Sequence, residues 1–307
     1  MNVSNPKISI ITPCLNMVNF IRDAIESVLA QDYKNFEHIV IDGGSTDGTV
    51  ELVRSYPHIK FISEPDKNLY DAINKGIKQA SGEIIGHLNS DDFYSKNVFG
   101  EIVRLFQQFP SADAVCGKAC IFEDNPKTNT RKIITKYEGS TFLDFSIESI
   151  TLQPPIINAK FFRKSLYHKF GLYNIDYSIS SDRDFLLRIA VNGSKSVGCE
   201  KMVYNYRKHP ESITNKKLTK RQKIKMLKQD LKLSESYLKK YGHIRSIQNV
   251  LTKWHTKISI YLLTIFLRQR KVKNAFSIIN RGLKHSTQFP IALVLAFARS
   301  ILIEKKR

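Results

Sequence analysis

The sequence has few cysteines, and they form no recognisable metal or disulfide motif. Cys14, Cys116, Cys120 and Cys199 include no Cys-x-x-Cys pair and have no nearby histidine at the spacing of a zinc site. A disulfide framework or a structural zinc is therefore not expected. We expect four reduced thiols, as is usual for a cytosolic protein.

Long apolar runs and a secretory leader are also missing. No run reaches the roughly 18 residues that a membrane span needs, and residues 1–7 lack the charged-then-apolar order of a secretory signal. The apolar stretch at residues 291–303, broken by Arg299 and Ser300, is too short to span a bilayer but long enough to embed in its surface. We expect a cytoplasmic protein.

Acidic residues are scarce in the last third of the chain. Residues 1–200 contain 22 Lys/Arg and 24 Asp/Glu, whereas residues 201–307 contain 26 and 4. The whole chain, with 307 residues and 42% hydrophobic content, can bury a substantial core. We predict two domains, residues 1–214 and a basic extension at residues 215–307, with the boundary near Asn215.

Short apolar segments alternate with amphipathic ones through the first part of the chain. This alternation predicts an α/β fold with a mainly parallel sheet covered by helices. The predicted strands are residues 7–12, 36–41, 59–63 and 83–88, and the predicted helices are residues 20–31, 49–56, 69–80 and 97–108.

The pattern changes after residue 114. Strands are expected from residue 114 and at 119–122 and 132–137, the last two antiparallel, so the sheet becomes mixed. Residues 139–177 are irregular apart from a predicted helix at 161–170, and we expect substrate specificity to reside there. Residues 218–300 predict helices throughout.

Two predicted strands end in acidic turns. Asp42 precedes Gly43 and Gly44, while Asp91 and Asp92 follow the strand at residues 83–88. Side chains beyond the carboxyl ends of parallel strands share one crevice, so these acids predict a pocket for a nucleotide and for Mg²⁺ or Mn²⁺. On local grounds alone, Asp42 could simply cap its turn, and Asp91 and Asp92 could cap the next helix.

Two later segments carry further candidate groups. Asp184 and Arg188 have the i, i+4 spacing of an ion pair, which leaves Asp182 as a candidate general base. The cationic cluster from Arg207 to His209 could face phosphates or, through the imidazole, a metal ion. The simpler alternatives are that Asp182 caps a surface helix and that His209 is an ordinary loop residue.

Taken in order, these motifs resemble the family-two inverting glycosyltransferases of the GT-A fold, over roughly residues 7–214. The set is specific where each piece alone is not. The matching pieces are Ile10-Ile11-Thr12-Pro13-Cys14-Leu15-Asn16, Ser27-Val28-Leu29-Ala30-Gln31, Val40-Ile41-Asp42-Gly43-Gly44-Ser45-Thr46-Asp47-Gly48-Thr49, Ser63-Glu64-Pro65-Asp66, Tyr70-Asp71-Ala72-Ile73-Asn74-Lys75-Gly76 and Leu88-Asn89-Ser90-Asp91-Asp92.

The resemblance implies a nucleotide-diphospho-sugar donor and a divalent ion, Mn²⁺ or Mg²⁺. It implies Asp182 as the catalytic base and an in-line displacement that inverts the anomeric centre. Asn89 stands where the family usually has the first Asp of its metal-binding DXD element, so Asn89 is assigned to the donor. The implied donor residues are Pro13, Asn16, Asp42, Asp66, Asp71, Lys75 and Asn89, and the implied metal ligands are Asp91, Asp92 and His209.

The basic extension has three possible interpretations. Aromatic and aliphatic residues such as Trp254, Tyr261 and Phe276 lie among the cations, which favours helices on the anionic inner face of the plasma membrane, near glycan or lipid-linked glycan acceptors. Packing as a helical subdomain would also explain the apolar stripes. Nucleic-acid binding would leave Asp42 and Asp91 unexplained, and no nucleic acid is expected as a partner.

One rival enzyme class remains open. A nucleotidyltransferase that makes a nucleotide sugar would share a nucleotide-binding α/β sheet. It should carry a Gly-rich, cationic loop directly after the first strand, and the segment from Pro13 to Asn16 is not such a loop.

Overall fold

The structure is a computed structural model that describes residues 5–125, 128, 130–210, 212, 219–286 and 289–294. The chain divides into two compact units, an N-terminal unit (residues 1–217) and a helical unit (residues 218–307). The predicted boundary at Asn215, and the part of the apolar segment 291–303 beyond residue 294, lie outside the described residues.

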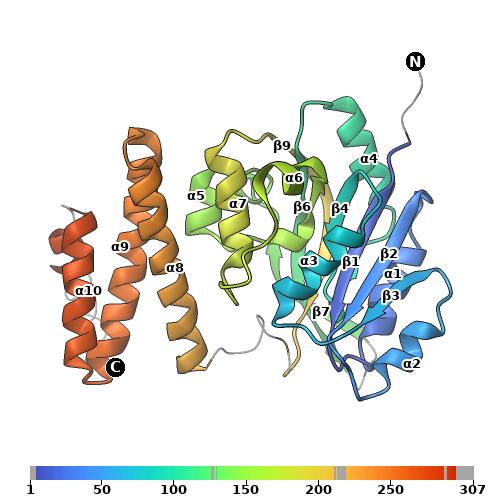
Figure 1. Ribbon diagram of the computed structural model, residues 1–307, viewed down its shortest axis with the longest axis horizontal. Coiled ribbons are helices and arrows are strands. Elements are labelled where there is room, and N and C mark those ends of the chain that lie inside the picture. The colour runs from blue at the N-terminus through green and yellow to red at the C-terminus, as the bar shows by residue number, and fades with distance from the viewer. Residues whose placement is uncertain are drawn as a thin grey trace. The chain divides into compact units, whose positions relative to one another are not determined.

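The N-terminal unit begins with alternating strands and helices, as the sequence predicts. Its first strands are parallel, with β1 between β2 and β4, and β3 on the far side of β2. Strands β1 and β4 are fully buried, and α3 packs on β1 and β2 (Figure 1). These elements are β1 (Ile8–Cys14), α1 (Ile21–Leu29), β2 (Phe36–Asp42), α2 (Thr49–Arg54), β3 (Ile59–Ser63), α3 (Leu69–Gln79), β4 (Ile84–His87) and α4 (Phe99–Gln108).

The sheet continues with mixed strand directions. Among the described residues it has nine strands in the order β3-β2-β1-β4-β8-β6-β9-β5, with β7 paired to β6. The pairing of β6 with β7 is antiparallel, which confirms the expectation for residues 119–122 and 132–137. The added strands are β5 (Phe93–Tyr94), β6 (Ala114–Asn125), β7 (Thr130–Tyr137), β8 (Lys160–Arg163) and β9 (Ser196–Arg207).

The helix predicted at residues 161–170 is wrong in its first part. Lys160–Arg163 form β8, antiparallel to both β4 and β6, and α6 covers only Ser165–Phe170. The reason is long-range, because Phe161 and Phe162 are fully buried in the sheet's core, where pairing and packing outweigh local pattern.

Residues 139–177 are otherwise irregular, as expected, and contain short helices. They are followed by α7, which carries Asp182. The remaining elements are η1 (Ser140–Phe142), α5 (Ile147–Leu152), η2 (Ile157–Ala159) and α7 (Ser181–Val191). The four cysteines are all buried and free.

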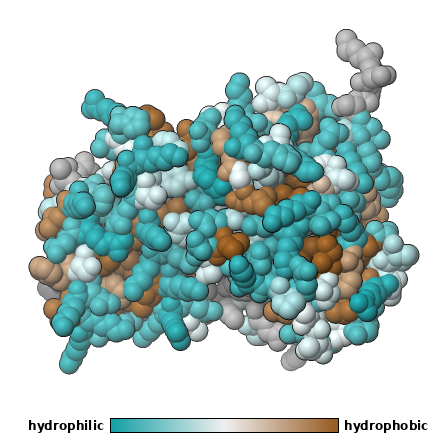
Figure 2. All heavy atoms as spheres, in the orientation of Figure 1, coloured by the Kyte–Doolittle hydropathy of each residue, from teal (hydrophilic) through white to brown (hydrophobic). Residues whose placement is uncertain are grey.

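The helical unit consists of α8 (Lys220–Tyr241), α9 (Arg245–Arg268) and α10 (Val272–His285), and α9 packs against the other two. A capping box formed by Thr219 and Gln222 starts α8. Hydrophilic side chains cover most of the face of this unit seen in Figure 2, with separate hydrophobic patches among them. Within the described ranges, no helix is long and apolar enough to cross a bilayer.

Candidate functional site

The ends of the parallel strands bring three predicted loops to one edge of the sheet. The register pairs Cys14 with Asp42 and Asp42 with Ser63. On the other side of β1, the amide of Leu88 donates to the carbonyl of Ile11 at 3.0 Å, so the loop after β4 leaves from the same edge. A ligand at this edge can therefore be reached from all three loops.

Asp42 is fully buried and holds the turn that follows it. Its carboxylate accepts hydrogen bonds from the amides of Gly44 at 3.1 Å and Ser45 at 3.0 Å, from the Ser45 hydroxyl, and from the Ser63 hydroxyl at 2.7 Å. Burial alone would raise the pKa of Asp42, but these hydrogen bonds outweigh it and lower the pKa. Asp42 thus caps its turn as an ionised carboxylate, and its contact with the donor stays a prediction.

Asn16 joins the loop after β1 to the loop after β2. Its side-chain oxygen accepts from the Thr46 amide at 2.9 Å, and its own amide donates to the Ser45 hydroxyl at 2.7 Å. Asn16 has a φ of 54°, a left-handed conformation that asparagine tolerates better than most residues. Pro13 pairs with Ile41 in the register of β1 and β2, so both predicted donor residues border the Asp42 turn.

Asp66 and Lys75 form an ion pair beside the same turn. Lys75 Nζ lies 2.8 Å from both Asp66 Oδ1 and Glu64 Oε1. Although burial opposes its charge, these two acids raise the pKa of Lys75 to about 12. A Cβ on Gly43 would lie 3.3 Å from Asp66 Oδ2, so this glycine allows the two loops to meet closely. Asp71 instead holds its own loop, where it accepts from the Lys67 amide at 3.0 Å.

Asp92, predicted as a metal ligand, is buried, and both of its oxygens accept hydrogen bonds from protein donors. Its Oδ2 accepts from the Tyr204 hydroxyl at 2.8 Å and the Asn89 side-chain amide at 3.1 Å, and its Oδ1 accepts from the Arg207 amide at 2.7 Å. Burial and the neighbouring charge of Asp91 raise its pKa well above the usual range. This carboxyl positions the loop after β4 and presents no oxygen to a ligand at the surface.

Asp91 and His209 meet although 118 residues separate them. His209 Nε2 lies 2.9 Å from Asp91 Oδ2, and the imidazole ring packs against Phe20 with ring centroids 4.3 Å apart. The other ring nitrogen, Nδ1, is buried and makes no hydrogen bond to the described residues. The structure therefore brings together two of the three predicted metal ligands.

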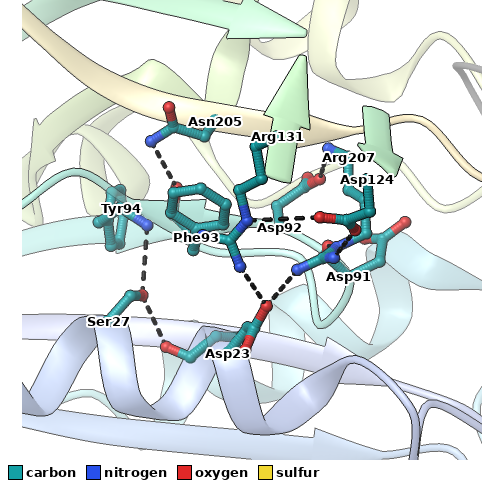
Figure 3. A network of polar contacts seen from close by, with 11 residues as sticks. Asp23, Ser27, Asp91, Asp92, Phe93, Tyr94, Asp124, Arg131, Asn205 and Arg207 are labelled. Atoms are coloured by element: carbon teal, nitrogen blue, oxygen red, sulfur yellow. Dashed lines mark hydrogen bonds and ion pairs between the residues drawn. The ribbon is translucent and has the colours of Figure 1, made fainter. Parts of the chain in front are cut away.

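Two arginines and two aspartates form a polar network next to this pair, shown in Figure 3. Arg207 donates through Nε to the Asp91 carbonyl at 2.9 Å, and its two terminal nitrogens reach Asp124 and Asp23. Arg131 also contacts Asp23, at 2.8 Å, and lies over the Phe93 ring. The sequence pointed only to the cationic cluster containing Arg207; no local signal marked Asp23, Asp124 or Arg131.

Asp182 lies in the first turn of α7, half buried. Its Oδ1 accepts from the Arg183 amide at 2.7 Å, and the Arg183 guanidinium binds the carbonyl of Thr151 at 3.0 Å. Asp184 and Arg188 form the predicted ion pair, at 3.0 Å, which confirms that expectation. The negative charges of Asp92 and Asp182 both help to raise the pKa of the half-buried Tyr206, after the larger effect of its burial, so both acids act on this ring of β9.

Helix α3 holds the loop that leads to Asp182. The Asn68 side chain donates to the Ile175 carbonyl at 2.9 Å, and the Tyr70 hydroxyl donates to the Ile179 carbonyl at 3.0 Å. Asn74 donates to the Tyr173 carbonyl at 2.8 Å and accepts from its amide at 3.0 Å. The helix that carries Asp71 and Lys75 therefore also fixes the approach to α7.

Comparison with known proteins identifies the family and the fold of this chain. The sequence model of Glycosyl transferase family 2 matches residues 9–171. An uncharacterized glycosyltransferase of Rickettsia prowazekii is 30% identical over 290 residues, which cover 84% of this chain and 87% of the relative.

Two solved structures share the fold at low sequence identity. S. aureus TarS 1–349 in complex with UDP-GlcNAc has a TM-score of 0.61 and 15% identity, over 89% of this chain and 90% of that one. The mannosyltransferase PcManGT from Pyrobaculum calidifontis, in complex with GDP-Man and Mn²⁺, has a TM-score of 0.58 and 16% identity, over 97% and 81%. The chain has the GT-A type of fold and belongs to glycosyl transferase family 2.

Proposed function

We propose that this glycosyltransferase is an inverting hexosyltransferase, which moves a sugar from a nucleotide-diphospho-sugar to a hydroxyl of a glycan or lipid-linked glycan. The observation that carries the proposal is the meeting of Asp91 and His209, 2.9 Å apart, at the edge where the nucleotide-side loops converge. Such a pair suits a divalent ion that faces a diphosphate.

The residues present fit a divalent ion. Asp91 supplies a carboxylate oxygen and His209 an imidazole nitrogen, and the nitrogen donor favours Mn²⁺ over Mg²⁺, which prefers oxygen. When bound, the ion supplies positive charge that stabilises the leaving diphosphate. Asp92 is buried and holds this loop through its hydrogen bond with Tyr204, so it is left out of the proposed ligand set.

Asp182 is the proposed general base. Its carboxylate takes the proton from the acceptor hydroxyl. The acceptor oxygen then forms its bond to the anomeric carbon as the bond from that carbon to the diphosphate breaks on the opposite side. One displacement inverts the anomeric centre. The contacts of Asn68, Tyr70 and Asn74 support the role of Asp182, because they hold its loop against the donor-side helix.

A ligand screen tests the donor and metal assignments. UDP-GlcNAc and GDP-Man, the donors in the two similar structures, are tested with and without Mn²⁺ by thermal shift, because a ligand that binds only the folded state raises its stability. One donor should stabilise the protein more with Mn²⁺ present, and Asp91→Asn should remove the Mn²⁺-dependent part. Asp176→Asn, an exposed acid on another loop, is the control. Equal shifts in Asp91→Asn and Asp176→Asn would contradict the metal assignment.

The inner face of the plasma membrane is the proposed location. Helix α10 exposes Val272 (72%), Phe276 (63%) and Leu283 (52%), and Lys273 and Lys284 lie beside them in the sequence. Exposed apolar side chains flanked by lysines are typical of helices that bind anionic lipid surfaces. This location would place the enzyme beside lipid-linked acceptors.

A further inference from the structure

Three side chains of metal-binding type, one from each helix, meet in the helical unit. They are Glu235 of α8, His255 of α9 and His285 of α10, and their candidate ligand atoms all lie within 4.8 Å of one another. We propose that these three residues bind a Zn²⁺ ion that links the three helices. The cysteine pattern predicted no structural zinc, and this set uses no cysteine.

The spacing of the Glu235 and His255 ligand atoms fits zinc. Glu235 Oε1 lies 3.4 Å from His255 Nε2, and the rings of His255 and His285 have centroids 4.9 Å apart. Two ligands bound to zinc at about 2.1 Å with a tetrahedral angle are about 3.4 Å apart. Two imidazoles and one carboxylate form a known zinc ligand set, with a fourth position for water.

The central histidine is not explained by the protein contacts around it. His255 is fully buried, and its Nδ1 makes no hydrogen bond to any described residue. The 3.4 Å contact of its other nitrogen with Glu235 is long for a hydrogen bond. Nε2 of this buried ring is therefore weakly satisfied, and a metal ion between Nε2 and the Glu235 carboxylate would replace the long contact.

Arg281 is a cation that contacts this cluster directly. Its Nε and one terminal nitrogen each donate to an oxygen of Glu235, at 2.7 Å. A carboxylate has about four acceptor positions, so this pairing leaves positions open on both oxygens. The Arg281 side chain is 35% exposed, which allows the guanidinium to move toward solvent when a second cation enters.

A cavity gives the ion a path to the cluster. It has a volume of about 660 Å³, and Glu235 and His285 are both part of its wall. The half-buried His285 thus connects this cavity to the buried His255. The same space can hold the water that completes the coordination of zinc.

Zinc titration of the full chain by calorimetry tests the proposal, with Asp91→Asn present so that the proposed catalytic metal does not contribute. One equivalent should bind, and His255→Ala and His285→Ala should each weaken binding by about tenfold or more. His243→Ala, which removes an exposed histidine of the same unit, should leave binding unchanged. Arg281→Gln should bind zinc at least as tightly, because it removes a competing cation.

Cobalt provides a second readout. Co²⁺ in place of zinc should give the visible absorption of a four-coordinate N/O site, which His285→Ala should abolish and His243→Ala should retain. Circular dichroism verifies that each variant keeps its helices. Absence of stoichiometric binding, equal affinities in His285→Ala and His243→Ala, or weaker binding in Arg281→Gln would each overturn the proposal. None of these outcomes depends on glycosyl transfer.

Discussion

At the scale of single residues, two buried histidines link the stability of the N-terminal unit to pH. His38 of β2 contacts the Thr12 hydroxyl at 2.9 Å, and His87 of β4 contacts the hydroxyls of Tyr167 at 2.8 Å and Tyr173 at 3.1 Å. Burial lowers the pKa of each imidazole to about 3. Both rings are therefore neutral at pH 7 in the folded protein.

The pH dependence follows from these values. An unfolded histidine has a pKa near 6.5, so between about pH 3 and 6.5 the unfolded chain binds more protons than the folded one. The stabilising effect is complete above about pH 6.5 and is lost as the pH falls, by up to roughly 1.4 kcal/mol per pH unit for each histidine. Unfolding by urea between pH 7 and 5 should show a shallower decline in His87→Gln than in His168→Gln, an exposed control. Parallel declines would contradict this assignment.

At the scale of elements, the close contact between α3 and β1 places the donor-side helix on the sheet. A Cβ on Gly76 would lie 2.4 Å from the Cγ2 atom of Ile11, which is fully buried in β1. The missing side chain at Gly76 allows α3 to lie close enough to the sheet for Lys75 and Asn74 to make their contacts.

Gly76→Ala should therefore destabilise the protein despite the better helix propensity of alanine. Overpacking costs about 1–3 kcal/mol and the propensity gain offsets about 1 kcal/mol, so a net loss on the order of 1 kcal/mol is expected. Gly100→Ala in α4 is the control, because the atoms nearest to its Cβ would belong to the flexible Asp32 side chain, the closest at 2.8 Å. Urea midpoints measure both variants. A Gly76→Ala protein as stable as Gly100→Ala would show that α3 shifts freely.

The sequence predicted the elements whose signal is local. The first strands and helices, and the loops after them, follow from periodicity and turn residues. Strands β8 and β9 were not predicted, because their partners are distant in the chain. The different environments of Asp91 and Asp92 also depend on β9, whose Tyr204 lies 112 residues beyond Asp92, and no local pattern could distinguish the two acids.

At the scale of the whole molecule, charge is the property that separates the two units. Residues 218–307 carry 21 Lys/Arg against 3 Asp/Glu and residues 1–217 carry 27 against 25, while the acids proposed for glycosyl transfer all lie before residue 201. A basic surface attracts anionic lipid within about a Debye length, so its effect weakens as salt increases.

Liposome flotation tests the proposed membrane contact. The full chain should float with phosphatidylserine-containing vesicles at low salt and less at high salt. Phe276→Ser combined with Leu283→Ser should reduce flotation several-fold without unfolding the protein, because both side chains are largely exposed. Tyr56→Ser, in the N-terminal unit, should float as the wild type does. If the double variant floated as well as Tyr56→Ser, α10 would not be the contact surface.

The central claim is that Asp182 acts as the base on a donor held at the edge that includes Asp91. The most direct test measures donor affinity and transfer rate together in Asp182→Asn, with Glu83→Gln, an exposed acid just before β4, as the control. The account predicts nearly unchanged donor affinity and a transfer rate lower by roughly 100- to 10,000-fold, the usual contribution of a general base. Equal loss of binding and transfer, or transfer within a few-fold of the wild type, would contradict it.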